Sequence, residues 1–457
     1  MTASTAAFAG DPARKKQPVG LFLLFGVEMW ERFSYYGMRA LLVLFLIDTG
    51  TGGWGWPKEN ASRLYAWYTG LVYLTPVIGG YLADRFIGTH RSLIIGGAII
   101  AAGHFCLALQ SQALFIVGLG LIVIGTGFFK SNVSTIVGQL YQQGDARRDG
   151  GFTIFYMGIN VGAFIGPLIC GYLGESPRWG WHWGFGAAGV GMVLGLAMYI
   201  VFKRRFLGDI GEVPAAKRAA ASHDATTAGP LGREERDRIY ALLITAFFVI
   251  FFWLAYEQAG SSMNIFAQQR TDRMVMGNEI PASWFQSINP AVILIFAPLF
   301  AGLWIALAAR GKEPSTPAKM AFGLLLLGGG FVFLVIGGRV SDGGAKASPL
   351  WITAAYVFHT LGELCLSPVG LSLVTKLAPL KLASLLMGVW YLANFAANLI
   401  GGYVAGAVEK VERGEVFRVF DGQADFFLMF VVSSVAAGVL LLGLTPKLRR
   451  MMHGRGG

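Results

Sequence analysis

The sequence predicts an all-α integral membrane protein whose twelve transmembrane helices form two six-helix bundles. Three observations predict this fold class. First, 54% of the 457 residues are hydrophobic and only 14% are charged, with a mean hydropathy of +0.56, whereas soluble domains carry about 25% charged residues. Second, the apolar residues fall into runs long enough to cross a bilayer. Third, one charged segment divides these runs into two sets of six.

Short polar loops separate the predicted spans. A helix needs about 20 apolar residues to cross the hydrocarbon core of a bilayer. The high hydrophobic content and the low charged content of the chain exclude a soluble enzyme. The predicted spans are 19–47, 64–83, 92–110, 114–140, 151–174, 183–202, 239–268, 284–309, 318–338, 350–375, 382–408 and 425–446.

The charged segment is 203–238, between the sixth and seventh spans. It contains eight Lys or Arg and six Asp or Glu residues and no apolar run, so we expect a cytoplasmic linker that does not span. It leaves an N-terminal bundle at 1–202 and a C-terminal bundle at 239–457. Two six-helix halves around a midplane site are typical of secondary transporters.

The basic residues predict the orientation. With both termini inside, the inner segments hold 24 Lys or Arg residues and the outer loops hold 10, so the positive-inside rule places both termini in the cytoplasm. Residues 1–18 are polar, and the apolar run that follows carries two Glu residues and no small-residue cleavage site. We therefore expect a retained first span and not a signal peptide.

Other classes of site and partner find little support. Cys106, Cys170 and Cys365 lie inside apolar runs without paired or metal-ligand spacing, so neither disulfides nor a zinc site is predicted. The formal charge of +11 comes from Lys and Arg between apolar runs, which indicates topology signals and not nucleic-acid binding. We expect no cofactor and no metal, with protons as the only coupling ion.

Seven Asp, Glu, Lys or Arg side chains lie in the interior of the predicted spans, away from their first and last residues. Each costs at least about 2.5 kcal/mol near the bilayer centre, so such residues normally face a cavity, a partner or a transport pathway. Fixed ion pairs that merely pack helices are the alternative, which is disfavoured because buried ion pairs stabilise less than apolar packing does. The seven are Glu28, Glu31, Arg32, Arg39, Lys130, Glu257 and Glu363.

Four of the seven lie in the first span, within EMWERFSYYGMR. Glu28, Glu31 and Arg32 share one helical face, and Arg39 continues it seven residues later. Burial favours a neutral carboxyl group and a nearby guanidinium favours a carboxylate, so an acid between these effects can exchange its proton as helices move. This arrangement predicts a proton-coupling site.

The acids of the second half provide partners for the bases of the first. Glu257 and Glu363 can pair with Arg39 and Lys130, and a bond between the halves would act as a gate. The seven residues are four acids and three bases, which is close to a balance of charge and favours such pairing.

At this point the sequence resembles the proton-dependent oligopeptide transporters (POT), a family within the major facilitator superfamily. The resemblance covers essentially the whole membrane core and implies the major facilitator fold. The matching segments are EMWERFSYYG at 28–37, GGYLADRFIG at 79–88, FYMGINVGAFIGP at 155–167, INP at 288–290 and HTLGELCLSPVGLSL at 359–373.

The resemblance implies roles for individual residues. It places proton coupling on Glu28, Glu31, Arg32, Lys130 and Glu257. Gates would form between Arg39 and Glu257 on the outer side and between Lys130 and Glu363. The peptide carboxylate would face the basic side, and its amino group would face the acidic and Asn side. Peptide contacts would come from Tyr36, Arg39, Tyr68, Lys130, Tyr156, Asn160, Trp253, Asn289, Glu363, Ser367, Trp390 and Asn394.

Two departures from the family concern its subgroups. Many bacterial members resemble fourteen-helix proteins, whereas 203–238 is too polar to add a helical pair. Animal members have a large insertion before the tenth span, whereas 339–349 is short. A bacterial inner-membrane protein is therefore favoured.

Several of these residues also have purely structural interpretations. Tyr156 and Asn160 lie one turn apart, and an Asn within a bilayer seeks a partner, which can simply be a neighbouring helix. Tyr36, Tyr68, Trp253 and Trp390 could line pockets for peptide side chains. Aromatic residues in membrane spans, however, more often pack against other helices or anchor a helix at the membrane interface. Asp84, in GGYLADRFIG, is expected to gate the cytoplasmic side by meeting a helix N-terminus or a basic partner.

The function predicted from these residues is proton-coupled import of di- and tripeptides by alternating access, by a protein that acts as a monomer. A transporter of nitrate or another small solute is the alternative, disfavoured because both motif acids, Glu28 and Glu31, are retained and because Glu363 would repel an anion. An intramembrane enzyme is a second alternative, but no metal spacing, nucleophile elbow or phosphate loop is present. A channel is the third, which a proton-gradient requirement for accumulation would exclude.

Overall fold

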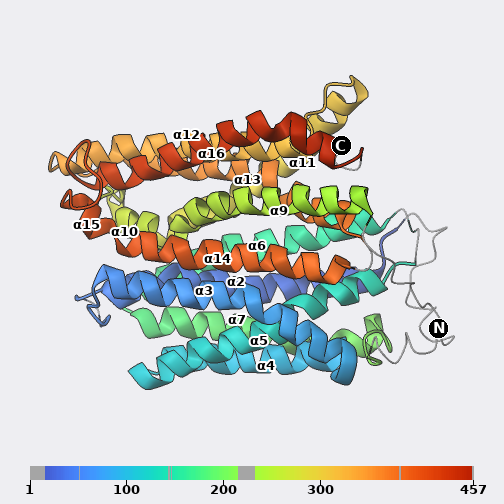
Figure 1. The fold of residues 1–457 in the computed structure, drawn as a ribbon. Helices are drawn as coiled ribbons and strands as arrows, with labels where there is room; N and C mark the ends of the chain where they lie inside the picture. The colour runs from blue at the N-terminus through green and yellow to red at the C-terminus, as the bar shows by residue number, and fades with distance from the viewer. Residues whose placement is uncertain are drawn as a thin grey trace. The chain divides into compact units, whose positions relative to one another are not determined.

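The computed structural model describes residues 16–50, 52–142, 145, 147–214, 232–379 and 382–454, without the side chains of 367–372, 375, 383 and 384. Helices dominate this part of the chain (Figure 1). The chain packs as two units, each with its own internal contacts. The central part of the predicted linker, 215–231, lies outside the described residues.

The first unit contains most of the N-terminal helices. Helix α2 belongs to it up to Phe45, and the long helix α3 belongs to it only from Leu71 onward. The elements are α2 (Val19–Ile47), α3 (Lys58–Leu82), the π-helical turn η1 (Ala83–Ile87), α4 (Thr89–Ala108), α5 (Gln112–Gln139), α6 (Arg148–Gly174) and α7 (Trp181–Phe206).

The second unit contains α3 up to Gly70 and the elements that follow the linker. A two-stranded antiparallel hairpin and short helical turns join its long helices. The elements are α9 (Arg233–Tyr256), η2 (Glu257–Gly260), α10 (Ser262–Gln269), β1 (Met274–Val275), β2 (Asn278–Glu279), η3 (Ala282–Ser287), α11 (Ile288–Ala309), α12 (Thr316–Asp342), α13 (Pro349–Leu377), α14 (Ala383–Gly406), α15 (Val408–Glu412) and α16 (Gln423–Met451).

The helices confirm the prediction of a helical, multi-pass membrane protein. A helix is present at each predicted span, and α2 has the predicted bounds of 19–47. Within the described ranges, nine helical segments are long and apolar enough to cross a membrane. Helix α2 is not among them because it carries four charged side chains. The arrangement of twelve membrane-spanning helices stays a prediction.

The seventh predicted span, 239–268, is not one continuous helix. Helix α9 ends at Tyr256, a 3-10 turn follows, and α10 begins at Ser262. The Gln258 amide donates to the carbonyl oxygen of Gly401 on α14 at 2.9 Å, and a Cβ atom on Gly260 would lie 1.8 Å from the Tyr65 hydroxyl oxygen. Packing against α14 and α3 therefore fixes a break that the apolar run did not predict.

Glycines bring α4 and α5 into close contact, and the two helices lie side by side in Figure 1. A Cβ atom on Gly96 would lie 2.7 Å from the Gly125 carbonyl oxygen, and a Cβ atom on Gly125 would lie 2.7 Å from that of Gly96. Small residues allow such close approach between membrane helices. This pair anchors α5, which carries Lys130.

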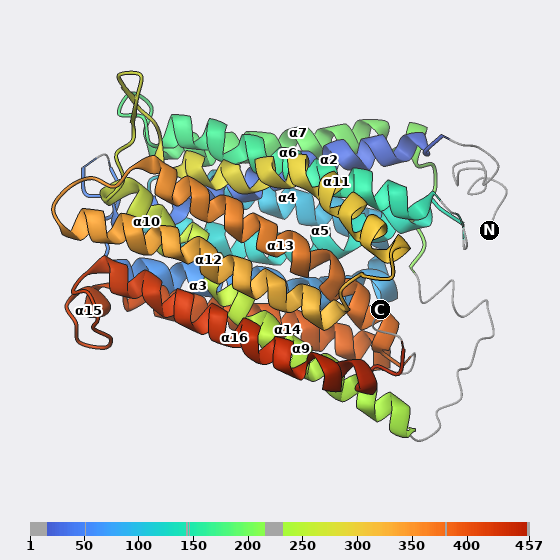
Figure 2. The same ribbon diagram turned by 90° about the horizontal axis from the view of Figure 1, so that it is seen from above.

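In the second unit, α12 packs along both α13 and α16, which Figure 2 shows from above. The Asp342 carboxylate, at the end of α12, accepts the backbone N–H groups of Gln423 and Ala424, each at 3.1 Å. These groups begin α16, where backbone donors lack partners within the helix. Asp342 therefore ties the end of one helix to the start of the other.

Candidate functional site

A charged triad lies on one face of α2. Arg32 Nε is 3.1 Å from Glu28 Oε1, and Arg32 Nη2 donates to Glu31 Oε1 at 2.8 Å. All three side chains are buried, and Glu28 Oε2 has no hydrogen-bond partner in the described part of the chain. The structure thus brings together the three residues that the sequence spacing placed on one face, with two carboxylates around one guanidinium.

Helix α6 packs closely against the triad's helix through glycines. A Cβ atom on Gly162 would lie 2.1 Å from the Met29 carbonyl oxygen. Gly158 and Gly166, one turn on either side, meet α2 backbone carbonyls in the same way, at 2.9 Å and 2.6 Å. Any larger residue here would force the helices apart, so these glycines fix where α2 lies on α6.

Further basic residues of the first unit lie against aromatic rings. The Arg39 guanidinium carbon is 5.8 Å from the ring centre of Tyr36. On α5, Lys130 Nζ is 4.3 Å from the ring centre of Tyr73 on α3, and its charge acts on Glu28. Cation–π contacts stabilise such cations where water is scarce. Lys130 thus packs on an aromatic ring and also interacts electrostatically with Glu28 of the triad.

The other predicted residues of the first unit lie on α6 and η1. The Asn160 side chain is buried, and its amide donates to the Tyr156 carbonyl oxygen of its own helix at 2.9 Å. Tyr156 is 36% exposed. Asp84 is exposed in η1, immediately after α3. A partner for Asp84 at a helix N-terminus or on a base stays a prediction.

In the second unit, Glu363 of α13 is the centre of a polar cluster. Tyr256 of α9 donates its hydroxyl to Glu363 Oε2 at 2.6 Å, and the Asn289 amide of α11 donates to the same oxygen at 2.9 Å. The other N–H of that amide donates to the Thr360 hydroxyl at 3.0 Å. Two helices, α9 and α11, therefore bring neutral donors to one buried acid on a third helix, α13.

Trp253 and Glu257 lie where α9 ends. Trp253 is one turn before Glu257, and its ring meets that of Tyr256 edge-on, with centroids 5.2 Å apart. Glu257 is buried at the first position of η2, and its charge acts on Glu363. The break in the helix thus places an acid at a helix end, close to the cluster around Glu363.

The remaining predicted residues of the second unit lie on α14, α3 and α13. The Asn394 amide donates to the Trp390 carbonyl oxygen at 2.9 Å, within α14, and both side chains are buried. Tyr68 is buried on the part of α3 that belongs to this unit. Ser367 is part of α13, but its side chain lies outside the described residues.

The two predicted gates each join residues of different units. Arg39 and Lys130 belong to the first unit, and Glu257 and Glu363 belong to the second. Both pairings stay predictions.

Sequence reasoning missed three residues that organise the site. Tyr256 directly precedes Glu257, but helical spacing alone does not direct its hydroxyl to Glu363. Thr360, three residues before Glu363, shares a helix face with it, and this spacing was a usable signal. Gly162 belongs to a glycine repeat at intervals of four residues, GINVGAFIG, which is typical of close helix contacts.

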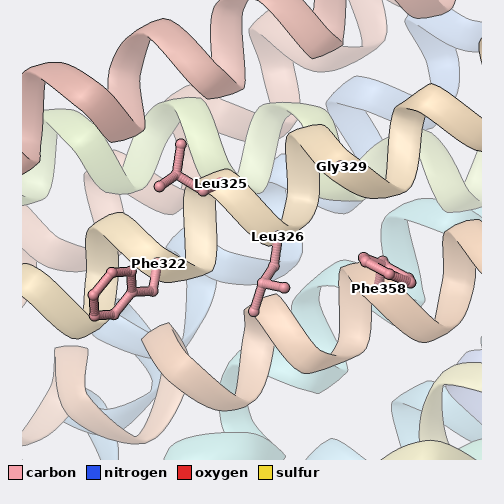
Figure 3. A pocket seen from close by; sticks show the side chains of 5 residues that line it. All are labelled: Phe322, Leu325, Leu326, Gly329 and Phe358. Atoms are coloured by element: carbon pink, nitrogen blue, oxygen red, sulfur yellow. The ribbon is translucent and has the colours of Figure 1, made fainter.

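An apolar pocket of about 390 Å³ lies apart from these residues. Four residues of α12 and one of α13 line it: Phe322, Leu325, Leu326, Gly329 and Phe358 (Figure 3). None of the predicted site residues lines this pocket. A wall without charge or hydrogen-bonding side chains does not suit a zwitterionic ligand, so the pocket is not a candidate peptide site.

Comparison with known proteins relates the whole chain to one family. The family model described as "POT family" matches residues 90–210 and 225–419. The peptide transporter YePEPT of Yersinia enterocolitica is 38% identical, over 95% of this chain and 95% of its own length. A di-/tripeptide transporter of Lactococcus lactis is 32% identical, over 95% of this chain and 97% of its own length.

A solved structure supports the same relationship. The chain is similar to a POT family transporter in complex with a thioalcohol-conjugated peptide, with 30% identity and a TM-score of 0.86, over 97% of this chain and 99% of that chain. The sequence motifs, the helical fold and these relatives agree. The chain therefore belongs to the POT family of peptide transporters, and it is a multi-pass membrane transporter and not an enzyme.

Proposed function

We propose that this protein imports di- and tripeptides together with protons, by alternating access of its two halves. One observation carries the proton-coupling role. Glu28 shares the Arg32 guanidinium with Glu31, and its second oxygen is buried without a hydrogen-bond partner in the described residues. A buried carboxylate oxygen in this situation is where a proton can bind and leave.

The charge of the triad explains why a proton binds there. With both acids ionised, two carboxylates around one guanidinium carry a net charge of −1, which the bilayer interior opposes. One proton makes the triad neutral. Movement of Lys130, whose charge acts on Glu28, changes this balance, so proton release can follow substrate binding at the lysine.

The two units would bind opposite ends of the peptide. Glu363 is an acid held by neutral donors, so a peptide ammonium group can complete its hydrogen bonds. Lys130, with Arg32 or Arg39, supplies positive charge for the carboxylate in the first unit. Asn160 and Asn289 would add hydrogen bonds, and Tyr36, Tyr68, Trp253 and Trp390 would line side-chain pockets. Tyr156, Ser367 and Asn394 complete the proposed contacts.

A coupled proton supplies enough free energy for accumulation. A zwitterionic peptide carries no net charge, so each proton contributes about 2.3 kcal/mol per 100 mV. This sustains a concentration ratio of roughly 40-fold. The driving force is adequate for nutrient uptake.

The proposal includes the finer architecture. Twelve spans would adopt the major facilitator arrangement, with halves at 1–202 and 239–457, a cytoplasmic linker at 203–238, and both termini in the cytoplasm. The protein would act as a monomer in a bacterial inner membrane, without a cofactor or metal. Opening and closing would use Arg39 with Glu257, Lys130 with Glu363, and Asp84 at the inner surface.

Uptake by proteoliposomes tests the function. Labelled dialanine should accumulate inside vesicles when the outside is acidic and the inside negative, and it should only equilibrate when the gradient is collapsed with an ionophore. Vesicles without protein provide the background. Equal accumulation with and without the gradient would remove proton coupling, and no uptake in either case would remove peptide transport.

A further inference from the structure

Tyr256 is held in place at the end of α9. Its ring stacks on Phe252, with centroids 5.6 Å apart and planes at 19°, and meets Trp253 edge-on. Two flanking aromatic side chains leave the ring little freedom to rotate. Contacts within α9 therefore help to orient the ring and its hydroxyl group.

That hydroxyl group reaches Glu363 on another helix. It donates to Oε2 at 2.6 Å, the short distance typical of a hydrogen bond to a carboxylate. The Asn289 amide donates to the same oxygen at 2.9 Å and is itself fixed by its bond to Thr360. The Thr360 hydroxyl in turn donates to the Tyr356 carbonyl oxygen at 2.7 Å.

Both donors use one oxygen of the carboxylate. Across the described chain, Oε2 of Glu363 accepts two hydrogen bonds and Oε1 accepts none. A carboxylate oxygen pair has about four acceptor positions. Glu363 is thus orientated through one oxygen, and its other oxygen keeps its capacity to accept.

We propose that Tyr256 is a positioning residue for the amino end of the substrate. Its hydroxyl group, together with the Asn289 amide, fixes Oε2 of Glu363, and Oε1 accepts the peptide ammonium group. This rests on the proposed function, because it assigns the support of the acid that would bind the peptide. Tyr256 does not touch the peptide in this scheme and acts through Glu363.

The expected size of the effect follows from the type of bond. A hydrogen bond to a charged group is worth enough to change an equilibrium constant about 10-fold or more. Tyr256→Phe removes the hydroxyl group and keeps the ring that packs on Phe252 and Trp253. The loss should appear only with ligands that carry a free ammonium group.

Three ligands separate positioning from a general structural role. Competition with labelled dialanine on the purified full-length protein would give affinities for dialanine, dialanine amide and N-acetyl-dialanine. In Tyr256→Phe, the first two should weaken about 10-fold, and N-acetyl-dialanine, which has no ammonium group, should keep its wild-type value. Tyr240→Phe is the matched control, because Tyr240 lies on the same helix and is exposed.

A double-mutant cycle tests whether the effect passes through Glu363. In a Glu363→Gln background, Tyr256→Phe should cause no further loss of dialanine affinity. Equal weakening of all three ligands, an additive loss in the double variant, or no change in Tyr256→Phe would each overturn the positioning role. If the wild-type protein bound no dialanine, the proposed function would fail, and this role with it. If the wild-type protein bound dialanine and Tyr256→Phe weakened all three ligands equally, only the role of Tyr256 would be refuted.

Discussion

Arg32 Nε lies 3.1 Å from Glu28 Oε1, while Glu28 Oε2 is buried without a hydrogen-bond partner in the part of the chain described. Glu31 differs, because it accepts from both Nε and Nη2 of the same guanidinium. The two acids of one motif therefore have unequal surroundings. Glu28 is the better candidate for the proton, and Glu31 holds Arg32.

This difference predicts distinct phenotypes for the two acids. Glu28→Gln should abolish gradient-driven accumulation of dialanine and keep most peptide exchange, because an amide preserves the shape but cannot release a proton. Glu31→Gln should lose accumulation as well and should also melt at a lower temperature, since Arg32 loses a paired partner. Uptake and counterflow in proteoliposomes, with melting curves, measure both effects. Unchanged proton-driven uptake in both variants would contradict the assignment.

Blocking either end of a peptide should weaken binding. An unpaired charged group left in the site costs about 2–5 kcal/mol, a loss of roughly 30- to 3,000-fold in affinity. N-acetyl-dialanine and dialanine amide should therefore compete poorly with labelled dialanine for uptake, and free alanine should fail because it cannot span the two charge clusters. Competition by alanine or by the doubly blocked peptide as strong as that of dialanine would remove the peptide assignment.

The contact between Gly162 and Met29 predicts a site where a small substitution is damaging. Gly162→Val should lower the free energy of unfolding by about 1–3 kcal/mol, as overpacking does elsewhere, and reduce transport by displacing the triad. Gly120→Ala in α5 is the control, since its Cβ atom would meet nothing within 4 Å. Melting temperatures and uptake rates measure both. Full stability in Gly162→Val would show that α2 and α6 can separate without cost.

The linker should label from one side only. A single cysteine introduced at Thr226, which lies outside the described residues, should react with an impermeant thiol reagent in inside-out vesicles and not in intact cells. Fourteen charges in the segment prevent it from entering the bilayer. Reaction from outside intact cells would reverse the proposed orientation.

Glu412, in α15, predicts a dependence of stability on pH. Burial raises the pKa of this carboxyl group, while Lys58 and Arg270 oppose the rise. An acid whose pKa is raised by folding loses stability as the pH rises from its unfolded pKa to its folded pKa. Glu412→Gln lacks this loss, so the variant should gain melting temperature over the wild type as the pH rises above about 4.3. A constant difference between the two proteins from pH 4 to 7 would argue against a raised pKa.

Local sequence predicted what a single helix determines. The triad on α2 follows from helical spacing, and the bounds of α2 follow from the polar residues at either end of an apolar run. The predicted span begins at 64, six residues after the start of α3 at Lys58, because the first turns of the helix, KENASR, are polar. Hydropathy indicates which residues lie within the membrane and not where a helix begins, so a prediction from hydropathy omits the polar ends of helices.

Contacts between distant residues were not predictable in this way. The break after Tyr256 depends on Gly401, which is 143 residues from Gln258, and no proline or glycine precedes it in FFWLAY. The support of Glu363 by Tyr256 likewise requires two helices to lie at one rotation about their axes. Such relationships belong to the packing, and a single sequence carries no direct record of them.

The glycine contacts along α6 restrict how the first unit can move. A backbone carbonyl of α2 lies against each of three successive turns of α6, so sliding by one residue, about 1.5 Å, would drive carbonyl oxygens into neighbouring side chains. Helices α2 and α6 therefore move as one rigid body. Glu28 and Glu31 on α2 and Asn160 on α6 must rotate together, so any tilt that reorients Asn160 also reorients the two acids. A chemical cross-link between α2 and α6 should accordingly leave the transport cycle intact.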